Sequence, residues 1–129
     1  MKEPRWLKRT WVDALHLEEL RHFGGQNGVR DDGAIEAAIA RPRNKWAYDG
    51  VRDLSLLAAA LGYGLCQNHG YVDGNKRVGF VAMGVFLELN GYALQTDEAD
   101  VVRTMLAVAS GTLSEEELGV WVTARAKLK

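Results

Sequence analysis

With 129 residues, the chain is long enough to bury one hydrophobic core and too short for two, so a single domain spanning residues 1–129 is predicted. A formal net charge of −1 argues against direct binding to nucleic acid, which usually requires a strongly basic surface. The single cysteine excludes an internal disulfide, and no apolar stretch reaches the ~18 residues of a membrane span. We therefore expect a cytoplasmic domain that binds neither nucleic acid nor membrane.

The first half of the chain is predicted to hold two helices and a flap. Apolar residues at helical spacing predict a first helix over Val12–Phe23, which two glycines then end. Asp31 or Asp32 is the expected N-cap of a second helix, and Pro42 is expected to stop it. Arg43–Val51 instead suits a short β-hairpin or flap, because it carries aromatic residues and an Asp-Gly turn pair.

The second half of the chain is predicted to be helical throughout. A third helix is expected over Arg52–Asn68, with leucines along one face. The fourth, over about Gly74–Asn90, is apolar nearly all round, which is typical of a helix buried at the centre of its domain. Thr96 or Asp97 is expected to cap a fifth helix, and a Ser-x-x-Glu capping box at 114–117 begins the last. The predicted fold is all-α, with one buried central helix and one flap.

Glycines also occur inside the third and fourth predicted helices. Each interior glycine costs a helix ~1 kcal/mol relative to alanine. The four glycines concerned are Gly62, Gly64, Gly79 and Gly84. Their cost is understandable if the two helices approach each other closely.

The connection between these two helices, residues 68–77, holds most of the chemically active side chains. The first N–H groups of a helix have no intrahelical partner and lie at the positive end of the helix dipole, which suits them to bind phosphate. Gly74 would let a phosphate approach the backbone, and Asn75 could hydrogen-bond it. Lys76 and Arg77 lie in the first helical turn, where cations are unfavourable for the helix itself, so an anion is expected beside them.

Two further side chains in this connection suit phosphoryl or nucleotidyl transfer. His69 has an unperturbed pKa near ~6.5, so it can take a proton from an attacking hydroxyl at neutral pH. Asp73 could hold Mg²⁺ that bridges nucleotide phosphates, because Mg²⁺ often takes only one or two protein carboxylates. The same residues also fit an ordinary turn, since Asp-Gly-Asn is common turn chemistry. Residue types by themselves leave both interpretations open.

These residues resemble the signature of the Fic/Doc family, His-x-Phe-x-Asp/Glu-Gly/Ala-Asn-Gly/Lys-Arg. In this chain the signature positions are occupied by His69, Tyr71, Asp73, Gly74, Asn75, Lys76 and Arg77. Tyrosine in place of phenylalanine is a conservative exchange. A second stretch between residues 24 and 48 resembles the Doc (death-on-curing) branch, and the resemblance covers most of the chain, roughly Val12 to Trp121.

The resemblance implies a Fic-like helical domain with a defined set of site residues. His69 would be the base for a target hydroxyl, and Asp73 would be the Mg²⁺ ligand. The phosphate cradle would consist of Gly74, Asn75, Lys76 and Arg77. Catalysis would depend on His69 and Asp73 together with Lys76 and Arg77.

Position 76 separates two activities within the family. Fic-type AMP transferases carry a second glycine there, whereas Doc-like toxins carry lysine and are kinase-like. Lys76 therefore implies a Doc-like toxin of a toxin–antitoxin module. Its expected reaction is Mg²⁺-dependent transfer of the γ-phosphate of ATP to a hydroxyl of a translation factor such as elongation factor Tu. The alternatives are an AMP transferase acting on a protein hydroxyl and a non-catalytic module that binds a nucleotide or a peptide.

Inhibition is expected to come from a separate chain. Many Fic enzymes carry a further arginine, three residues after the motif arginine, that pairs with an inhibitory glutamate, whereas this chain has Phe80. The resemblance implies a cognate antitoxin whose C-terminal helix occupies an apolar groove, but the sequence does not locate that groove. Trp46 and Tyr48 in the predicted flap either dock the target segment, as the flap does in relatives, or fill the core beneath it.

Overall fold

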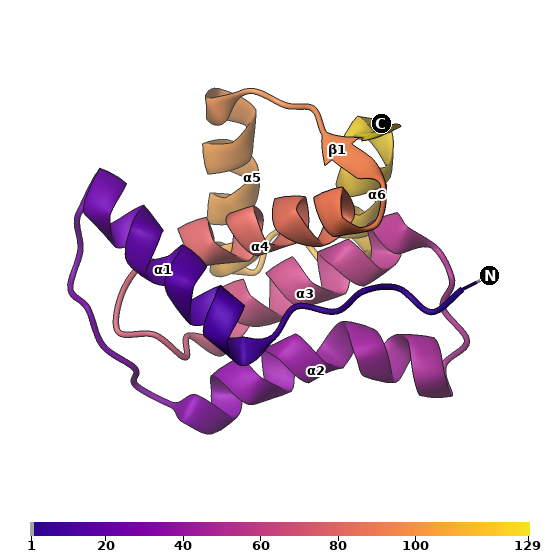
Figure 1. Ribbon diagram of the computed structural model, residues 1–129. Coiled ribbons are helices and arrows are strands. Elements are labelled where there is room, and N and C mark those ends of the chain that lie inside the picture. Colours follow the sequence, from indigo (N-terminus) through magenta and orange to yellow (C-terminus); the bar gives the residue numbers. More distant parts are fainter. Residues whose placement is uncertain (1) are drawn as a thin grey trace.

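The computed structural model describes residues 2–129, which form six α-helices and two short strands (Figure 1). In chain order these elements are α1 (Arg9–Phe23), α2 (Asp32–Tyr48), α3 (Leu54–Asn68), α4 (Asn75–Leu89), β1 (Tyr92–Leu94), α5 (Glu98–Ser110), α6 (Glu115–Arg125) and β2 (Ala126–Leu128). The all-α architecture expected from the sequence is confirmed. No helix in this part of the chain is both long and apolar enough to cross a membrane.

The helix at the centre of the fold is α3, which packs against α2, α4, α5 and α6. Ten of its fifteen residues are buried. The buried central helix expected from the sequence was α4, and α4 is indeed buried where it meets α1 and α3. Phe80 and Val81 on its remaining face are only half-buried, because little of the chain covers that face. Burial is therefore shared between α3 and α4, with α3 the more enclosed.

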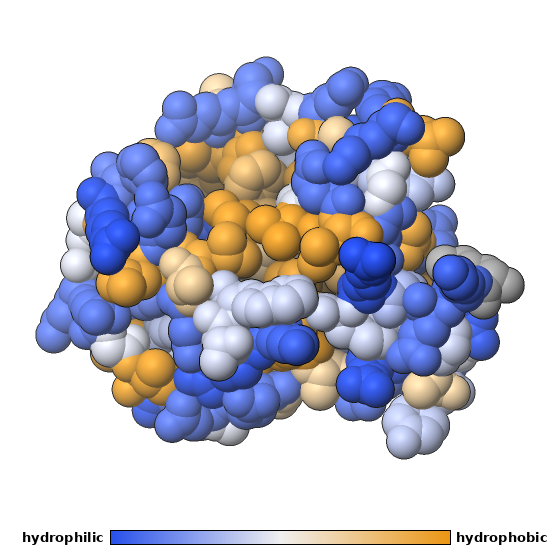
Figure 2. All heavy atoms as spheres, viewed as in Figure 1, coloured by the Kyte–Doolittle hydropathy of each residue, from blue (hydrophilic) through white to orange (hydrophobic). Residues whose placement is uncertain are grey.

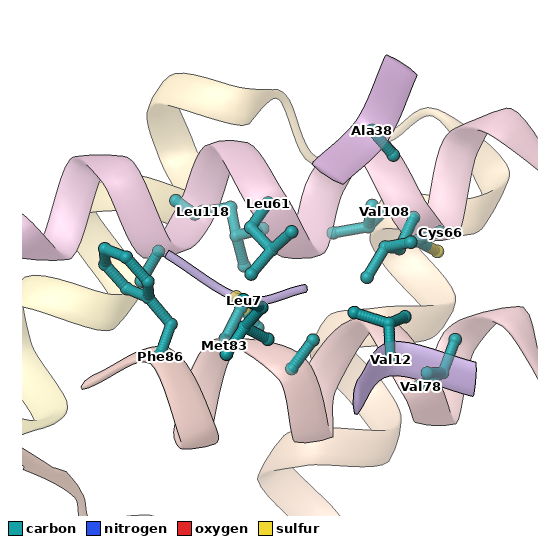
Figure 3. Close-up of a cluster of buried hydrophobic side chains, with 14 of the residues drawn as sticks. Leu7, Val12, Ala38, Leu61, Cys66, Val78, Met83, Phe86, Val108 and Leu118 are labelled. Carbon is teal, nitrogen blue, oxygen red and sulfur yellow. The ribbon is translucent and has the colours of Figure 1, made fainter. Parts of the chain in front are cut away.

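Helices α1 to α6 and the N-terminal segment meet in one hydrophobic core (Figure 3). Leu7 from the N-terminal segment lies between Leu61 of α3 and Met83 of α4. Cys66 of α3 is fully buried in this core, and desolvation raises the pKa of its thiol to about 11. A thiol that holds its proton this strongly is a poor nucleophile, so Cys66 contributes packing.

The backbones of α3 and α4 come into close contact at Gly62 and Gly79. A Cβ atom placed on Gly79 would lie 2.9 Å from the carbonyl oxygen of Gly62, a separation that real Cβ atoms do not tolerate. The close approach indicated by the interior glycines is therefore confirmed at this crossing. Gly84, one and a half turns further along α4, has open space around its Cβ position.

Gly79→Ala is expected to destabilise the protein by about 1–3 kcal/mol, the usual cost of overpacking. The added methyl group meets a backbone carbonyl, which cannot rotate away as a side chain can. Gly84→Ala is the matched control, because its methyl group meets nothing and should stabilise α4 by up to ~1 kcal/mol through helix propensity. Urea unfolding of both variants measures the two free energies, and a stabilised Gly79→Ala protein would contradict the close crossing.

The predicted flap is wrong, because α2 continues through Pro42 and ends at Tyr48. Helical spacing places Arg41 and Lys45 on one face of α2, where both reach the carboxylate of Glu115 on α6. The Nε atom of Arg41 lies 2.8 Å and the Nζ atom of Lys45 lies 3.1 Å from that carboxylate. These long-range ion pairs connect the second half of α2 to the start of α6, and Pro42 itself is buried within the continuous helix.

The two aromatic residues of the predicted flap have different environments. Trp46 is half-buried, with its ring edge-on to Trp6 at a centroid distance of 6.3 Å and the Arg52 guanidinium 4.4 Å from its ring. Tyr48 is 83% exposed at the end of α2. Trp46 therefore packs against the body of the protein, whereas Tyr48 does not.

The N-caps expected for α2, α5 and α6 are confirmed, and the structure decides between the paired candidates, whereas α1 begins three residues before and α3 two residues after the expected position. Asp31, rather than Asp32, is the N-cap of α2, and Asp97, rather than Thr96, is the N-cap of α5. The capping box at 114–117 forms both of its hydrogen bonds at the start of α6.

The two strands are formed by residues outside the predicted flap. β1 and β2 pair antiparallel, with Tyr92 opposite Leu128. Asp100 of α5 ties this end of the molecule together by accepting hydrogen bonds from Thr96 and from Arg125 of α6. Desolvation would raise the pKa of Asp100, but these hydrogen bonds outweigh it and lower the pKa to about 2.

Candidate active site

The loop between α3 and α4 begins at His69, which adopts the left-handed backbone conformation with φ 48° and ψ 46°. Among residues 2–129 it is the only non-glycine residue with positive φ, and such conformations are concentrated at functional sites. Gly70, the next residue, is buried so closely that a Cβ atom would lie 3.1 Å from the backbone nitrogen of Ile35. The loop is thus pressed against the start of α2 at Gly70, while the imidazole of His69 is exposed.

The end of this loop forms an open helix N-terminus. Gly74 is the N-cap of α4, with φ 80°, and no side chain caps the helix. The first intrahelical hydrogen bond runs from the N–H of Val78 to the carbonyl of Gly74 at 3.0 Å. The N–H groups of residues 75–77 therefore have no intrahelical acceptor and add to the positive end of the helix dipole. Such an arrangement can bind a phosphate.

Asp73 is exposed beside this helix N-terminus. Its carboxylate accepts hydrogen bonds from the backbone N–H of Gln26 at 3.2 Å and of Gly74 at 2.9 Å. These two hydrogen bonds, with smaller help from the charges of Arg77 and Lys76, hold the pKa of Asp73 below its usual value. The carboxylate is therefore ionised at neutral pH and has the charge that a metal ligand needs.

One carboxylate, that of Asp73, lies beside the helix N-terminus. Mg²⁺ often takes only one or two protein carboxylates and completes its ligands with water and nucleotide phosphates, so this residue fits the Mg²⁺ that the resemblance implies.

The side chain of Asn75 is committed to the loop itself. Asn75 is buried, its Oδ1 atom accepts from the N–H of Tyr71 at 3.1 Å, and its Nδ2 atom donates to the carbonyl of Tyr71 at 2.9 Å. These two hydrogen bonds join residues 71 and 75 of the loop and fix the shape of the turn between them. What Asn75 presents toward a bound phosphate is chiefly its backbone N–H at the start of α4.

The two cations of the motif differ in how firmly they are held. Arg77 donates a hydrogen bond to the carbonyl of Gly24 at 3.3 Å, and its guanidinium lies 4.8 Å from the ring centroid of Phe23. Lys76 is exposed and forms no hydrogen bond or ion pair with residues 2–129. Arg77 is thus anchored to the end of α1, whereas the ammonium group of Lys76 is available to a bound anion.

An extended segment runs beside the motif loop, but it is the connection between α1 and α2, not Arg43–Val51. The N–H of Val72 donates to the carbonyl of Gly28 at 3.0 Å, and the N–H of Arg30 donates to the carbonyl of Gly70 at 2.8 Å. These hydrogen bonds form an isolated antiparallel bridge that centres on Val29. The only sequence signal for this extended segment was a glycine-rich stretch without apolar periodicity. Gly28, in this stretch, has a positive φ of 139°.

The buried side chain of His16 contacts the motif loop, although the sequence pattern did not single it out. His16 of α1 is 2% exposed, and its Nε2 atom lies 2.7 Å from the carbonyl oxygen of Asp73. Its ring stacks on the ring of Tyr71, with centroids 3.8 Å apart and planes 10° from parallel. The hydroxyl of Tyr71 donates to Asp13 at 2.6 Å, so tyrosine in place of the family's phenylalanine forms a contact of its own. A helical spacing of Asp13 and His16 was the available signal.

An apolar groove of about 530 Å³ adjoins the motif between α4, α5 and the end of α1. Figure 2 shows this apolar surface as an orange band over α4, hollowed between α1 and α5. Lys76 and Arg77 line the groove as well. Its apolar lining includes Phe80, Val81, Leu94, Val101, Val102 and Leu106. The position where many Fic enzymes carry a second arginine is thus part of an apolar wall.

Comparison with known proteins agrees with the signature. The sequence model of the Fic/DOC family matches residues 6–87. A protein named Toxin Doc from Mycolicibacterium smegmatis (strain ATCC 700084 / mc(2)155) is 45% identical over 76 residues, which is 58% of this chain and 58% of that protein. Protein kinase doc of Escherichia phage P1 is 30% identical over 101 residues, 78% of this chain and 79% of that protein. The resemblance noted in the sequence is confirmed: the chain belongs to the Fic/DOC family.

Proposed function

We propose that this chain is a Doc-like toxin that transfers the γ-phosphate of ATP to a hydroxyl of a translation factor resembling elongation factor Tu. The observation that carries the proposal is the motif loop, which joins an exposed histidine to an open, cationic helix N-terminus. The names of the two relatives, a toxin and a protein kinase, support the same activity.

The residues of the loop have complementary roles in this proposal. His69 accepts the proton of the target hydroxyl as its oxygen attacks the γ-phosphorus and the bond from that phosphorus to ADP breaks. The N–H groups at the start of α4, with Lys76 and Arg77, hold the phosphates and stabilise the charge that develops on them. Asp73 would hold Mg²⁺, which when bound neutralises phosphate charge. Gly74 supplies the left-handed turn, with φ 80°, that precedes these N–H groups, and its Cβ position faces His16 and Leu20 rather than the phosphate.

The target segment is proposed to dock on the extended segment beside the motif. The bridge to the motif loop uses the carbonyl of Gly28 and the N–H of Arg30. The N–H and carbonyl of Val29 form no hydrogen bond within residues 2–129 and are therefore available to an added strand. A hydroxyl on that strand would come close to the loop that carries His69.

The cognate antitoxin is proposed to place an amphipathic C-terminal helix in the groove between α4 and α5. Phe80 extends the apolar wall where an internal inhibitory glutamate would need an arginine, which favours an apolar partner from a separate chain. Lys76 and Arg77 at the groove offer an acidic residue of the partner two cations. Such a helix would cover the phosphate cradle from the side.

The test of the proposed function is label transfer. The chain is incubated with elongation factor Tu, Mg²⁺ and ATP labelled on either the γ- or the α-phosphate, followed by the same assay on whole lysate. Label from the γ-phosphate supports the kinase. Label from the α-phosphate instead identifies an AMP transferase, and no label on any protein identifies a binding module without transferase chemistry.

Lys76→Gly is expected to shift the product from γ-label toward α-label. Removing the lysine side chain opens the helix start, so that the nucleotide can bind with a different phosphate facing the hydroxyl. The ratio of the two labels on the target measures the shift. An unchanged ratio in a folded Lys76→Gly protein would contradict the role assigned to the lysine.

A further inference from the structure

We infer that His16 of α1 is a positioning residue whose hydrogen bond to the carbonyl of Asp73 sets the shape of the glycine turn before α4. The inference rests on the proposed function of the motif loop. It concerns a residue outside the signature, 57 positions earlier in the chain.

The contacts of His16 fall on the backbone of Asp73 and Gly74, whereas the hydrogen bonds from Gln26 and Gly74 go to the carboxylate of Asp73. A carbonyl oxygen only accepts, so the Nε2 atom of His16 carries the hydrogen of the 2.7 Å bond to Asp73. The same nitrogen would lie 3.4 Å from a Cβ atom on Gly74. His16 therefore contacts Asp73 and Gly74, the two residues that connect the carboxylate to the phosphate cradle.

The remainder of α1 makes His16 a fixed support. Arg9, Asp13, His16 and Leu20 follow each other at spacings of four, three and four, which places them on one helix face. Arg9 pairs with Asp13 at 2.9 Å and ties α1 to α2 through Asp32 at 2.7 Å. Tyr71, on which His16 stacks, bonds to Asp13. One face of α1 thus holds the loop at Tyr71 and at Asp73.

The rest of the loop explains why this support matters. Asn75 bonds to the backbone of Tyr71, but these hydrogen bonds do not involve Asp73 or Gly74, and no side chain caps α4. The carbonyl of Asp73 receives its hydrogen bond from His16. A buried histidine is often only a packing residue, and in that case an apolar side chain of similar length would replace it without effect on the loop.

A matched pair of variants separates positioning from packing. His16→Gln keeps a donor nitrogen at nearly the reach of Nε2, whereas His16→Met fills similar space without a donor. We expect kcat for phosphate transfer to fall about 10- to 100-fold in His16→Met, because residues that orient a metal ligand have effects of this size. The Mg²⁺ concentration for half-maximal rate should rise by a similar factor. Both quantities should return toward the wild-type values in His16→Gln.

Amide hydrogen exchange of the ligand-free protein tests the same inference without activity. In His16→Met the hydrogen-bonded amides of Tyr71, Gly74 and Val78 should exchange at least about tenfold faster than in His16→Gln, while those of α3 stay unchanged. Equal exchange and equal kcat in the two variants, or failure of both to fold, would overturn the inference. If the wild-type protein transfers no label, the proposed function fails, and the exchange comparison still decides whether His16 positions the loop.

Discussion

His69→Ala is expected to lower the rate of phosphate transfer about 10²- to 10⁴-fold, the usual contribution of a positioned general base. The imidazole is exposed at the start of the motif loop and forms no hydrogen bond within residues 2–129. Its removal should therefore change the free energy of unfolding by only about 1 kcal/mol, which reflects the lower preference of alanine for the left-handed backbone at φ 48°. The initial rate of γ-label transfer and a thermal melt measure the two effects on the same protein.

Two controls make the His69 result specific. His69→Asn also removes the base, but asparagine adopts the left-handed conformation more readily than alanine, so the backbone at φ 48° is kept. His22→Ala removes an exposed histidine of α1 that pairs with Glu18, away from the loop. Transfer should be lost in both His69 variants and retained in His22→Ala. Activity in His69→Asn near that of the wild type would assign the base to another group.

Val102→Asp and Leu106→Asp are expected to abolish neutralisation by the antitoxin. Both side chains are 51% exposed on α5 and line the apolar groove. A helix bound there would bury the new carboxylate without a partner, which costs several kcal/mol. Because each 1.4 kcal/mol weakens binding tenfold, the Kd should rise at least about 100-fold.

Cells that express each variant with the antitoxin should stop growing, whereas cells with the wild-type pair should grow. Titration calorimetry with a peptide of the antitoxin's C-terminal segment gives the change in Kd. Val120→Asp is the matched control, because Val120 is an apolar residue of α6 with 71% exposure outside the groove. Full neutralisation of the Val102 and Leu106 variants would show that the antitoxin binds elsewhere.

Features that depend on neighbouring residues were predictable from the sequence. The helix starts at Asp31, Asp97 and Ser114 form as expected because an N-cap bonds to N–H groups two or three residues away. The motif loop could be recognised because its histidine, carboxylate, glycine and cations are contiguous. The family was recognisable for the same reason. Gly62 and Gly79 correctly indicated the close crossing of α3 and α4, whereas Gly64 meets Ala38 of α2 and Gly84 meets nothing.

Features that depend on distant residues were decided only by the tertiary structure. α2 continues past Pro42, and its second half contacts Glu115, more than seventy residues away, through Arg41. The extended segment beside the motif, the strand pair of β1 and β2, and the apolar groove each join parts of the chain that no local pattern relates.

The sequence by itself determined which residues form the candidate site, because they lie within nine positions of each other, from His69 to Arg77. Only the tertiary structure decided how these residues are held, because the support comes from α1. The hydrogen bond from His16 to Asp73 and the ion pairs of Arg9 become visible once the helices have packed. Short-range hydrogen bonds specify the loop, and long-range packing gives it a fixed orientation.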